Sequence, residues 1–383
     1  MKIAYFSKTD IPSFSANSNQ SMQVCAAMTR LGHSVTFFVI AEENSDEQVE
    51  PQEIFDFYDI EDRFLIKKLS VPDTRGSRLR YLWSVLITIP RVIKELFQGN
   101  FDLVFGRDLI SCCVAIVFRL RTIYESHAPV WLGLVEGSIF KIIVHSRYFW
   151  KLVVISHSLR EEYLSHYGSF ESKIYVAPDG SEVKPKGMGY DVNLKGKSSK
   201  LRVGYVGQLY EGKGVEVIEA IAKDMPDIDF HVIGGSPEDV IFWQKRMISD
   251  NVFFYGSIKR KHLACYYRSL DVCLLPNQEE VFGAGDRKLT KRVNIGSYTS
   301  PLKLFEYMAH GKAIVASDLP VLREVLHEGI AVFVSPKDFA GWKEAIRILL
   351  SPEKRAKLGL AAKEELALKY SWTGRMEKIL VRN

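Results

Sequence analysis

The segment Ser300–Lys312 carries residues whose types and spacing fit the binding of a nucleotide. Ser300 is a favoured N-cap, Pro301 fits the first helical position and Gly311 fits the helix end, so we predict a helix that begins at Pro301. The unpaired amides and positive dipole end of that helix would bind a diphosphate. Glu306, about one and a half turns in, could accept hydrogen bonds from the hydroxyls of a ribose. The alternative is an ordinary capped helix with Glu306 on its solvent face.

The segment Val206–Gly214 is a second candidate phosphate site. Its glycines would let backbone amides approach a phosphate, and Lys213 would add a positive charge. The spacing matches neither the Walker loop nor the dinucleotide fingerprint, so it does not indicate ATP or NAD. The alternative is a tight turn between a strand and a helix, with a solvated lysine.

In the first half of the chain, Tyr124–Pro129 follows an expected strand and places His127 in a loop where it could bind sugar hydroxyls. Arg107 follows another strand and is a further candidate site residue. The alternative is that it only forms an ion pair with Asp108. A lone histidine is more often structural. No Ser-His-Asp set and no close pair of carboxylates is recognisable, so the sequence does not indicate a hydrolase.

These segments need scaffolds, and the composition predicts two of them. A chain of 383 residues, 47% apolar and 25% charged, is that of a globular protein that exceeds one hydrophobic core. Short β-rich runs alternate with helical segments in both halves, which predicts two doubly wound α/β domains of Rossmann type. The five cysteines form no Cys-x-x-Cys pair, so they are expected to be free thiols without a metal. The expected strands are Lys2–Phe6, Ser34–Val39, Leu103–Phe105, Thr122–Tyr124, Leu152–Ile155, Leu201–Val206, Asp229–Ile233, Val252–Tyr255, Val272–Leu275 and Ala313–Ala316.

Composition also predicts the domain boundaries. The stretch Val183–Lys200 is rich in Lys, Gly and Ser, which is typical of an exposed linker. We therefore predict a first domain over 1–185, a linker over 186–200, a second domain over 201–360, and a C-terminal helix over 361–383 that crosses back to the first domain.

The net charge of +5 is too small to indicate binding of nucleic acid, but its distribution is uneven. Arg75–Phe97 mixes basic residues with aromatic and aliphatic ones, which suits the surface of an anionic membrane. The alternative is that its apolar residues pack onto the first domain, with Pro90 limiting a continuous helix. No apolar run is long enough to span a membrane, so we expect a cytoplasmic protein, peripheral at most. The segment from Arg63 to Lys94 contains one acidic residue, Asp73, and eight basic ones: Arg63, Lys67, Lys68, Arg75, Arg78, Arg80, Arg91 and Lys94.

Taken in order, these segments resemble the large bacterial family of retaining glycosyltransferases called group 1, or family four. The resemblance runs over nearly the whole chain and implies the GT-B fold, in which two Rossmann-like domains face each other across a cleft. It implies that the first domain binds an acceptor and the second a nucleotide sugar. The segments that carry it are Leu31–Val35, Arg107, Tyr124–His127, Val154–Leu159, Val176–Gly180, Tyr205–Leu209, Lys213–Gly214, Ser300–Gly311 and Tyr370–Trp372.

The resemblance also implies roles for individual residues. Lys213 would contact the donor diphosphate, Glu306 would hold the nucleotide ribose, and His127 would lie near the transferred sugar, so these three are the candidate catalytic residues. Such enzymes usually need no metal, because lysine and helix amides neutralise the leaving diphosphate. The implied donor side comprises Gly207, Gln208, Lys213, Ser300, Pro301, Leu302, Lys303 and Glu306; the implied acceptor side comprises Asn17, Arg107, Glu125 and His127.

Three positions depart from the family pattern. Tyr298 stands where many members have a first glutamate, and Gln208 stands where an arginine is usual. The glycine pair expected after the first strand is replaced by Ser13–Asn19. Recognition of the donor sugar would then depend on the loop Gln278–Thr299, which the sequence does not let us interpret.

The resemblance implies a retaining hexosyltransferase that moves a sugar from a UDP- or GDP-sugar to a glycan or lipid-linked acceptor in bacterial surface polysaccharide synthesis. The acceptor would attack on the face of the leaving group, with the departing phosphate as base. Two alternatives stay open: a non-catalytic partner that binds a nucleotide sugar, and an epimerase on the same fold. Substituting Glu306 or Lys213 by alanine is expected to abolish donor binding and to keep the fold.

Overall fold

The computed structural model describes residues 1–42, 50–72, 78–133, 135–168, 170–183, 191–197, 199–282 and 294–381. The chain forms two compact units. Unit 1 comprises Met1–Ala177 and Trp372–Asn383, and unit 2 comprises Pro178–Ser371. Part of the predicted linker, part of the loop Gln278–Thr299, and the start of the basic stretch Arg75–Phe97 lie outside the described residues.

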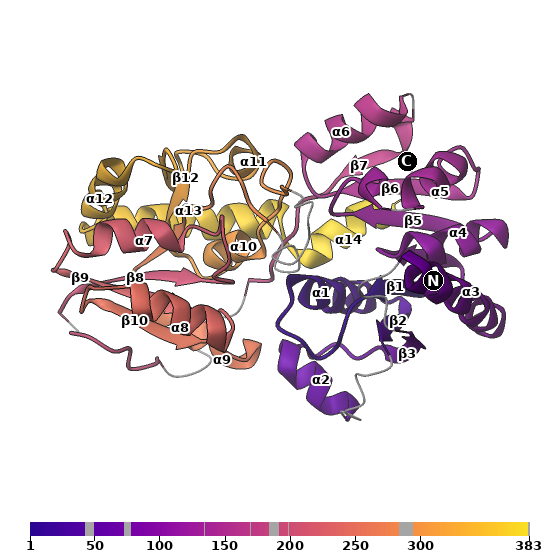
Figure 1. Ribbon diagram of the computed structural model, residues 1–383, viewed down its shortest axis with the longest axis horizontal. Coiled ribbons are helices and arrows are strands. Elements are labelled where there is room, and N and C mark those ends of the chain that lie inside the picture. The colour runs from indigo at the N-terminus through magenta and orange to yellow at the C-terminus, as the bar shows by residue number, and fades with distance from the viewer. Residues whose placement is uncertain are drawn as a thin grey trace. The chain divides into compact units, whose positions relative to one another are not determined.

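Unit 1 is built on a seven-stranded sheet in the order β3-β2-β1-β4-β5-β6-β7, and every strand pair in it is parallel (Figure 1). The strands are β1 (Lys2–Lys8), β2 (Ser34–Glu42), β3 (Leu65–Val71), β4 (Leu103–Gly106), β5 (Arg121–Ser126), β6 (Phe149–Val154) and β7 (Ile174–Val176). The helices are α1 (Ala16–Arg30), α2 (Pro51–Tyr58), α3 (Arg78–Gly99), α4 (Leu109–Val117), α5 (Glu136–Ile143), α6 (His157–Tyr167) and α14 (Trp372–Leu380), with short 3₁₀ turns at Val130–Leu132 and Glu171–Lys173.

Unit 2 repeats this architecture with a parallel six-stranded sheet in the order β10-β9-β8-β11-β12-β13. The strands are β8 (Leu201–Val206), β9 (Ile228–Ile233), β10 (Val252–Gly256), β11 (Val272–Leu275), β12 (Ala313–Ser317) and β13 (Ala331–Val334). The helices are α7 (Val215–Ala222), α8 (Pro237–Arg246), α9 (Arg260–Ser269), α10 (Leu302–Ala309), α11 (Pro320–Arg323), α12 (Phe339–Ile348) and α13 (Pro352–Lys369).

In unit 2, helices cover both faces of the sheet, and this explains why a central strand such as β11 is a continuous apolar run. All residues of β9, β11 and β12 are buried. In unit 2 the two faces of the sheet pack into two separate clusters, one around α7 and α12 and the other around α10 and α13. A parallel strand buried on both faces shows no alternation of apolar and polar residues, which is the pattern that the sequence displays.

The two predicted doubly wound α/β domains are confirmed by these sheets. All ten expected strands are present, whereas β3, β7 and β13 were not predicted. The predicted limit on a helix at Pro90 is wrong, because α3 runs from Arg78 to Gly99 with Pro90 inside it. Pro90 is exposed, and a proline on the solvent side of a helix removes one backbone bond whose carbonyl partner can bond to water instead.

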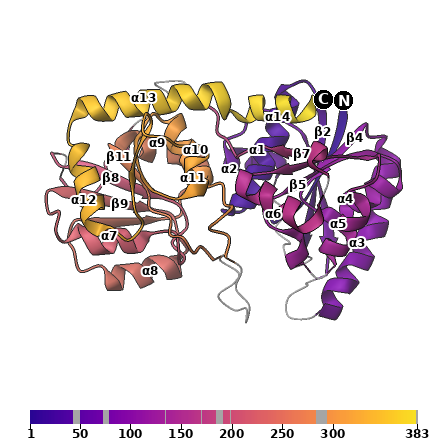
Figure 2. The ribbon, with the colours of Figure 1, turned by 90° about the horizontal axis from the view of Figure 1, so that it is seen from above.

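The chain returns to unit 1 at Trp372. Helix α13 belongs to unit 2 and packs against α10, whereas α14 packs against α1 of unit 1 (Figure 2). Trp372, Met376 and Ile379 of α14 are fully or almost fully buried. The C-terminal segment is therefore part of the core of unit 1, although it is separated from the rest of that unit by nearly two hundred residues of sequence.

Candidate functional site

In unit 2 the candidate residues gather where the sheet order reverses, between β8 and β11. These two strands pair only through Val203 with Val272 and Gly204 with Cys273, so they separate towards their carboxyl ends. The Tyr307 hydroxyl of α10 fills the gap, since it accepts from the Val206 amide (3.0 Å) and donates to the Leu274 carbonyl (3.1 Å). Helix α10 is thereby fixed at the position where open α/β sheets bind ligands.

The loop after β8 approaches its neighbours so closely that it requires glycine. Gly212 and Gly214 have φ angles of +85° and +91°, which favour glycine. A Cβ on Gly212 would lie 2.1 Å from the Glu280 carbonyl oxygen, and one on Gly214 would lie 1.8 Å from that of Pro276. Gly214 is also the N-cap of α7, so the loop delivers the chain into the N-terminus of a helix at this edge of the sheet.

Two lysines with no carboxylate partner among the described residues lie at this edge. Lys303 of α10 is 8% exposed, and its ammonium has no hydrogen-bond partner in the part of the chain that the structure describes; it lies 4.1 Å from the ring centroid of Tyr205. Burial, and after it the charge of Lys213, holds the pKa of Lys303 well below its usual range, which Glu216 offsets in part. Burial also lowers the pKa of Lys213 to about 8. Two buried cations that repel each other form a site that an anion would stabilise.

The side chain of Lys303 was not identified from the sequence, where only the backbone of this segment was implicated. Its Cδ lies 3.5 Å from the position of a Cβ on Gly207, directly beside Gln208. The structure therefore places a cation from α10 next to the position where the family's usual arginine is missing. A lysine within the buried run Leu302–Ala309 was the signal that could have shown it.

Asn277, directly after β11, is a second residue that sequence reasoning missed. Its side chain is 1% exposed, and neither its amide nitrogen nor its carbonyl oxygen has a hydrogen-bond partner within the described ranges. The neighbouring Gln278 amide donates to the Gly212 carbonyl (2.9 Å), which joins this segment to the glycine loop. A buried amide with both polar atoms unpaired is costly unless a ligand supplies the partners.

Glu306 lies inside unit 2, so the alternative with Glu306 on the solvent face is wrong. It is 7% exposed, and its two carboxylate oxygens have different partners. Oε1 forms an ion pair with Arg260 (2.6 Å), and Oε2 accepts from the Tyr267 hydroxyl (2.5 Å). Both partners come from α9, and no local pattern in the sequence linked that helix to Glu306.

The start of α10 is shifted by one residue from the prediction. Pro301 is the N-cap and Leu302 the first helical residue, and the predicted N-cap bond of Ser300 is not made. Instead the Ser300 hydroxyl accepts from the Asp179 amide (3.0 Å), so it ties the segment after Pro178 to the start of this helix. Gly311 follows the helix with a φ of +60°, as a glycine at a helix end should.

The remaining donor-side positions make local contacts. The Gln208 carbonyl accepts from the Tyr205 hydroxyl (2.5 Å), which shapes the start of the glycine loop. The Gly207 amide donates to the Ile233 carbonyl (2.9 Å). Tyr298, which stands at the family's first glutamate position, is buried at 5% exposure.

In unit 1 the carboxyl end of β5 presents Glu125 and His127. The Nε2 atom of His127 lies 2.7 Å from Oε1 of Glu125. Burial alone would raise the pKa of Glu125, but the charge of Arg375 and the hydrogen bond with His127 outweigh it and hold this pKa well below its usual range. Burial, and after it the charge of Arg107, lowers the pKa of His127 to about 4. At neutral pH the pair is therefore a carboxylate and a neutral imidazole.

Glu125 is surrounded by partners from other elements. Arg375 of α14 donates to Oε1 (3.1 Å), and Gln20 of α1 also donates to it through its side-chain nitrogen. The carbonyl oxygen of Gln20 accepts in turn from Arg107 (3.0 Å). The alternative in which Arg107 pairs with Asp108 is wrong, because the Asp108 carboxylate caps α4 by accepting from the Ser111 amide.

Asn17 lies in the first turn of α1. Its amide nitrogen donates to the Lys8 carbonyl (2.9 Å), and its oxygen accepts from the Ser7 hydroxyl (3.3 Å). It joins the carboxyl end of β1 to the start of α1, which Ser15 caps by accepting from the Ser18 amide. Asn17 therefore lies on the same edge of the sheet as Arg107 and Glu125, because parallel strands end on one side.

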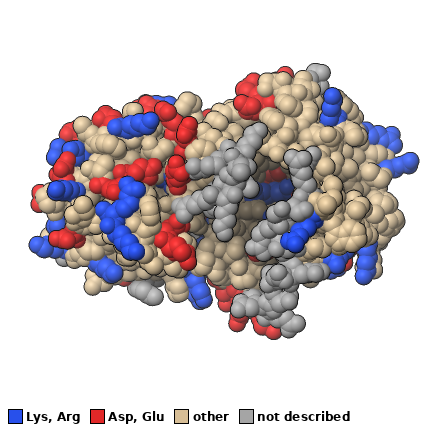
Figure 3. Space-filling view, viewed as in Figure 1, with Lys and Arg blue, Asp and Glu red and all other residues tan. Residues whose placement is uncertain are grey.

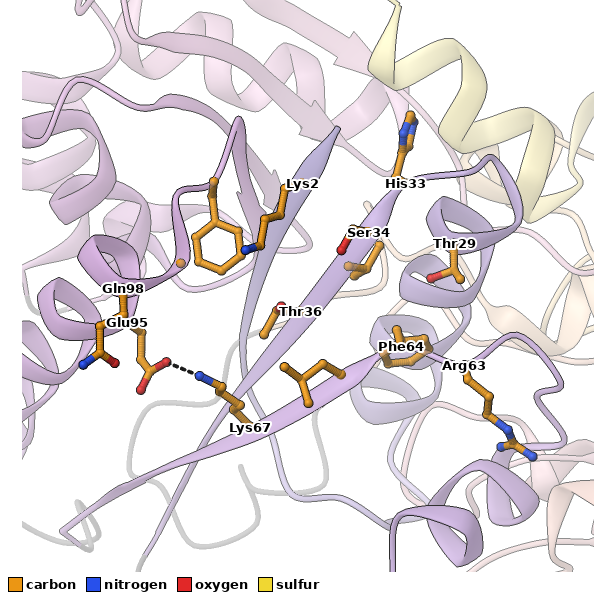
Figure 4. A pocket seen from close by; sticks show the side chains of 14 residues that line it. Lys2, Thr29, His33, Ser34, Thr36, Arg63, Phe64, Lys67, Glu95 and Gln98 are labelled. Atoms are coloured by element: carbon orange, nitrogen blue, oxygen red, sulfur yellow. Dashed lines mark hydrogen bonds and ion pairs between the residues drawn. The ribbon is translucent and has the colours of Figure 1, made fainter.

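Unit 1 also contains a cavity of about 590 Å³ on the opposite edge of the sheet. It is lined by residues at the starts of β1, β2 and β3, including Lys2, Ser34 and Leu65 (Figure 4). Lys67 on its wall pairs with Glu95 (2.7 Å). None of the predicted site residues lines this cavity, and ligands in open α/β sheets bind at the carboxyl ends of the strands, so it is distinct from the candidate site.

Helix α3 exposes apolar side chains in a stripe. Leu79, Leu82, Trp83 and Leu86 are between 44% and 77% exposed, and they recur at the spacing of one helix face. The alternative in which the apolar residues of this segment all pack onto the domain is therefore wrong for these four. No helix of the described residues is long and apolar enough to cross a membrane. On the face of unit 2 seen in Figure 3, by contrast, basic and acidic side chains are interspersed.

Sequence models of two families match the chain. The model described as Glycosyltransferase Family 4 matches residues 19–183, and that described as Glycosyl transferases group 1 matches residues 200–352. The first match contains Gln20, Arg107 and the Glu125–His127 pair, and the second contains both lysines, Asn277 and Glu306.

Individual relatives are more distant. The phosphatidyl-myo-inositol mannosyltransferase of Mycolicibacterium smegmatis is 27% identical over 166 residues, which cover 42% of this chain and 39% of that protein. The chain thus spans about two fifths of the length of this curated relative. Among solved structures, sucrose-phosphate synthase from Thermosynechococcus elongatus has a TM-score of 0.72 at 20% identity, over 99% of this chain and 97% of that one. Anabaena HepE in complex with UDP and glucose has a TM-score of 0.64 at 15% identity, over 99% and 98%. These two structures share the fold.

Proposed function

Because this chain belongs to the glycosyltransferases of group 1 and family 4, we propose that it transfers a sugar from a nucleotide-sugar donor to an acceptor hydroxyl. The donor nucleotide binds in unit 2 at the carboxyl ends of β8 and β11. The acceptor side is the edge of unit 1 that carries Arg107, Glu125 and His127. The HepE complex with UDP and glucose supports a UDP-sugar as the first donor class to test.

The observation that carries this proposal is a pair of lysines that have no carboxylate partner among the residues that the structure describes. Lys213 and Lys303 come from different elements and lie where the sheet order reverses, and each has its pKa lowered by burial. A diphosphate bridging them would supply the missing negative charge and restore their ordinary protonation. Asn277, whose amide is unpaired, would supply both a donor and an acceptor to the same ligand.

The same charges support the chemical step. When the bond between the sugar and the diphosphate breaks, negative charge develops on the leaving phosphate oxygens. Fixed cations held at that point before the reaction stabilise this charge without having to reorganise. We propose that transfer retains the anomeric configuration. The acceptor hydroxyl attacks on the face of the leaving group, and the departing phosphate takes its proton. The protein then mainly positions the two substrates and stabilises the charge on the leaving phosphate.

We propose that no metal ion is required, because Lys213 and Lys303 together supply the two positive charges that a divalent cation would bring to the diphosphate. The test is turnover after treatment with EDTA. Activity that falls with chelation and returns with Mg²⁺ would contradict this part of the proposal. Lys303→Met would separate the two cases, because a metal-dependent enzyme would tolerate it better.

The acceptor is proposed to be a glycan or lipid-linked saccharide of a bacterial surface polysaccharide, reached at the inner face of the cytoplasmic membrane. The exposed stripe on α3, with Arg80 and Lys94 exposed on the same helix, supports peripheral contact with an anionic bilayer. The name of the mycobacterial relative, a mannosyltransferase acting on phosphatidyl-myo-inositol, supports a lipid-linked acceptor.

The decisive experiment is release of nucleoside diphosphate. The purified protein is incubated with a panel of UDP- and GDP-sugars, with and without a bacterial membrane extract. Release that depends on the extract and is lost in Lys213→Met and Lys303→Met supports transfer. If the wild type releases no nucleoside diphosphate with any combination of donor and extract, the proposal is contradicted.

A second candidate is a non-catalytic subunit that binds a nucleotide sugar. The specific observation in its favour is that Tyr298 and Gln208 stand where the family usually has a glutamate and an arginine, so one carboxylate and one phosphate-binding cation are replaced. This candidate predicts donor binding without turnover under every condition. An epimerase would convert the donor sugar without an acceptor, which the same assay detects by analysing the unreacted donor.

A further inference from the structure

The carboxylate of Glu125 is held by charged and polar groups from three other parts of unit 1. Arg375 comes from α14, Gln20 from α1, and Arg107, bonded to Gln20, from the end of β4. The side chains of Glu125 and Arg375 are 0% and 3% exposed. Removing either partner of this buried ion pair would leave an uncompensated charge inside the protein.

The arrangement determines the chemistry that His127 can perform. An ionised carboxylate can only accept, so the Nε2 atom of His127 that faces it must carry the proton. The other ring nitrogen, Nδ1, is then an unprotonated acceptor. It has no hydrogen-bond partner among the described residues, and the His127 side chain is 19% exposed. An accessible nitrogen that can only accept is suited to a hydroxyl group of a substrate.

Glu125 keeps this tautomer only while it stays ionised and correctly oriented. Gln20 cannot ensure ionisation, because its amide is neutral. Arg375 can, since its guanidinium contacts both oxygens of Glu125, at 3.1 and 3.4 Å. Its own position is fixed by a bond to the Ala177 carbonyl (3.1 Å) and by the buried residues of α14 around it.

We infer that Arg375, at the far end of the sequence, is a positioning residue that holds Glu125 ionised and thereby keeps His127 as a neutral Nε2–H imidazole whose Nδ1 accepts a bond from a substrate hydroxyl. This inference rests on the proposed function only for the identity of that hydroxyl. Within unit 1, the charges of Arg107 and Arg375 lower the pKa of the His127 imidazole, and the charge of Glu125 raises it.

The test observes the imidazole in the protein alone, by ¹⁵N NMR of the labelled histidines. In the wild type at neutral pH, we expect His127 to show the Nε2–H tautomer. In Arg375→Gln and Arg375→Met we expect its pKa to rise by about one unit or more, as when a nearby cation is lost, and the single tautomer to be replaced by a mixture. Arg375→Lys, which keeps the charge, should restore the wild-type signal.

Two controls exclude a loss of structure. Lys378→Met removes an exposed charge from the same helix and should leave His127 unchanged. His33 belongs to unit 1, and its pKa is lowered by burial, so an unchanged His33 signal shows that unit 1 remains folded. If Arg375→Met does not fold, Arg375→Gln carries the same test, because it removes the charge and keeps a hydrogen-bond donor.

An unchanged tautomer and pKa of His127 in the folded Arg375→Gln protein would overturn the inference. The expected change in the imidazole would support it even if no donor and acceptor pair gave turnover, in which case the proposed function would be at fault. Where turnover is measurable, Arg375→Gln should lower kcat with little change in the KM for the donor, and Arg375→Lys should recover most of it.

Discussion

The Oε1 atom of Glu306 lies 2.6 Å from the guanidinium of Arg260, and this ion pair is largely buried. The sequence predicts that Glu306→Ala loses donor binding and keeps the fold. Because the substitution removes the carboxylate that Arg260 and the Tyr267 hydroxyl contact in the described part of unit 2, we now expect it to destabilise unit 2 by about 1–3 kcal/mol. Urea unfolding measures this cost.

Arg260→Met, Glu306→Gln and the double variant complete a cycle for this pair. Coupling of at least about 1 kcal/mol between the two residues is expected. Additive effects would show that the ion pair contributes little in solution and that Glu306 is free to turn towards a ribose.

Lys213 should make folding stability depend on pH in the alkaline range. Its folded-state pKa is lowered to about 8, so protonating it opposes folding. This penalty is fully present below about pH 8 and disappears as the pH rises towards the ordinary lysine pKa of about 10.5. Lys213→Met should therefore be more stable than the wild type at pH 7, on the order of 1 kcal/mol, with the difference closing by about pH 10.5. A difference that is constant over this range would show that Lys213 is not buried as a cation.

Lys303 should be a principal contact of the donor diphosphate. With UDP and GDP as probes, Lys303→Met and Lys213→Met should each weaken binding by about ten- to a hundredfold, the loss of one charge-assisted hydrogen bond. Isothermal titration calorimetry measures the affinities. Lys337→Met, which removes an exposed lysine elsewhere in unit 2, is the matched control and should bind as the wild type does. Undiminished binding by Lys303→Met would remove this residue from the site.

Asn277 should show opposite effects on stability and on binding. Asn277→Leu replaces a buried amide with no partners by an apolar side chain of similar size, so it should stabilise the ligand-free protein by about 1 kcal/mol or leave it unchanged. The same variant should raise the melting temperature less than the wild type does when UDP-sugar is added, because the ligand loses its contacts to the amide. Clear destabilisation without ligand would mean that the amide has partners in solution.

The stripe on α3 should bind anionic membranes. Replacing Leu82, Trp83 and Leu86 by serine should reduce co-sedimentation with vesicles that contain phosphatidylglycerol, and raised salt should weaken the binding of the wild type. Ile248→Ser, which removes an apolar side chain that is 89% exposed in unit 2, is the control. Equal sedimentation of the triple variant and the wild type would contradict the proposed membrane contact.

The sequence by itself determined the architecture and the location of much of the candidate site. Val272–Leu275 and Leu201–Val206, which is apolar except for Arg202, could be recognised as strands because a parallel strand buried on both faces is predominantly apolar. Glycines in the loop after such a strand, here Gly212 and Gly214, marked the candidate phosphate loop. These are local signals that depend on the backbone of a few consecutive residues. They can be recognised without knowing which distant segments pack against them.

Only the tertiary structure decided which side chains have partners. In the sequence Lys303 is an ordinary helical lysine, and only the structure shows that its ammonium is buried with no acceptor among the described residues. Arg375 and Glu125 are 250 residues apart, and no periodicity connects them; they meet because α14 returns to pack on α1. Burial and pairing depend on contacts between distant segments, and they determine the charge state of a group more strongly than its type does. The partner of Glu306 is decided in the same way, because its ion pair with Arg260 depends on the packing of α9 against α10.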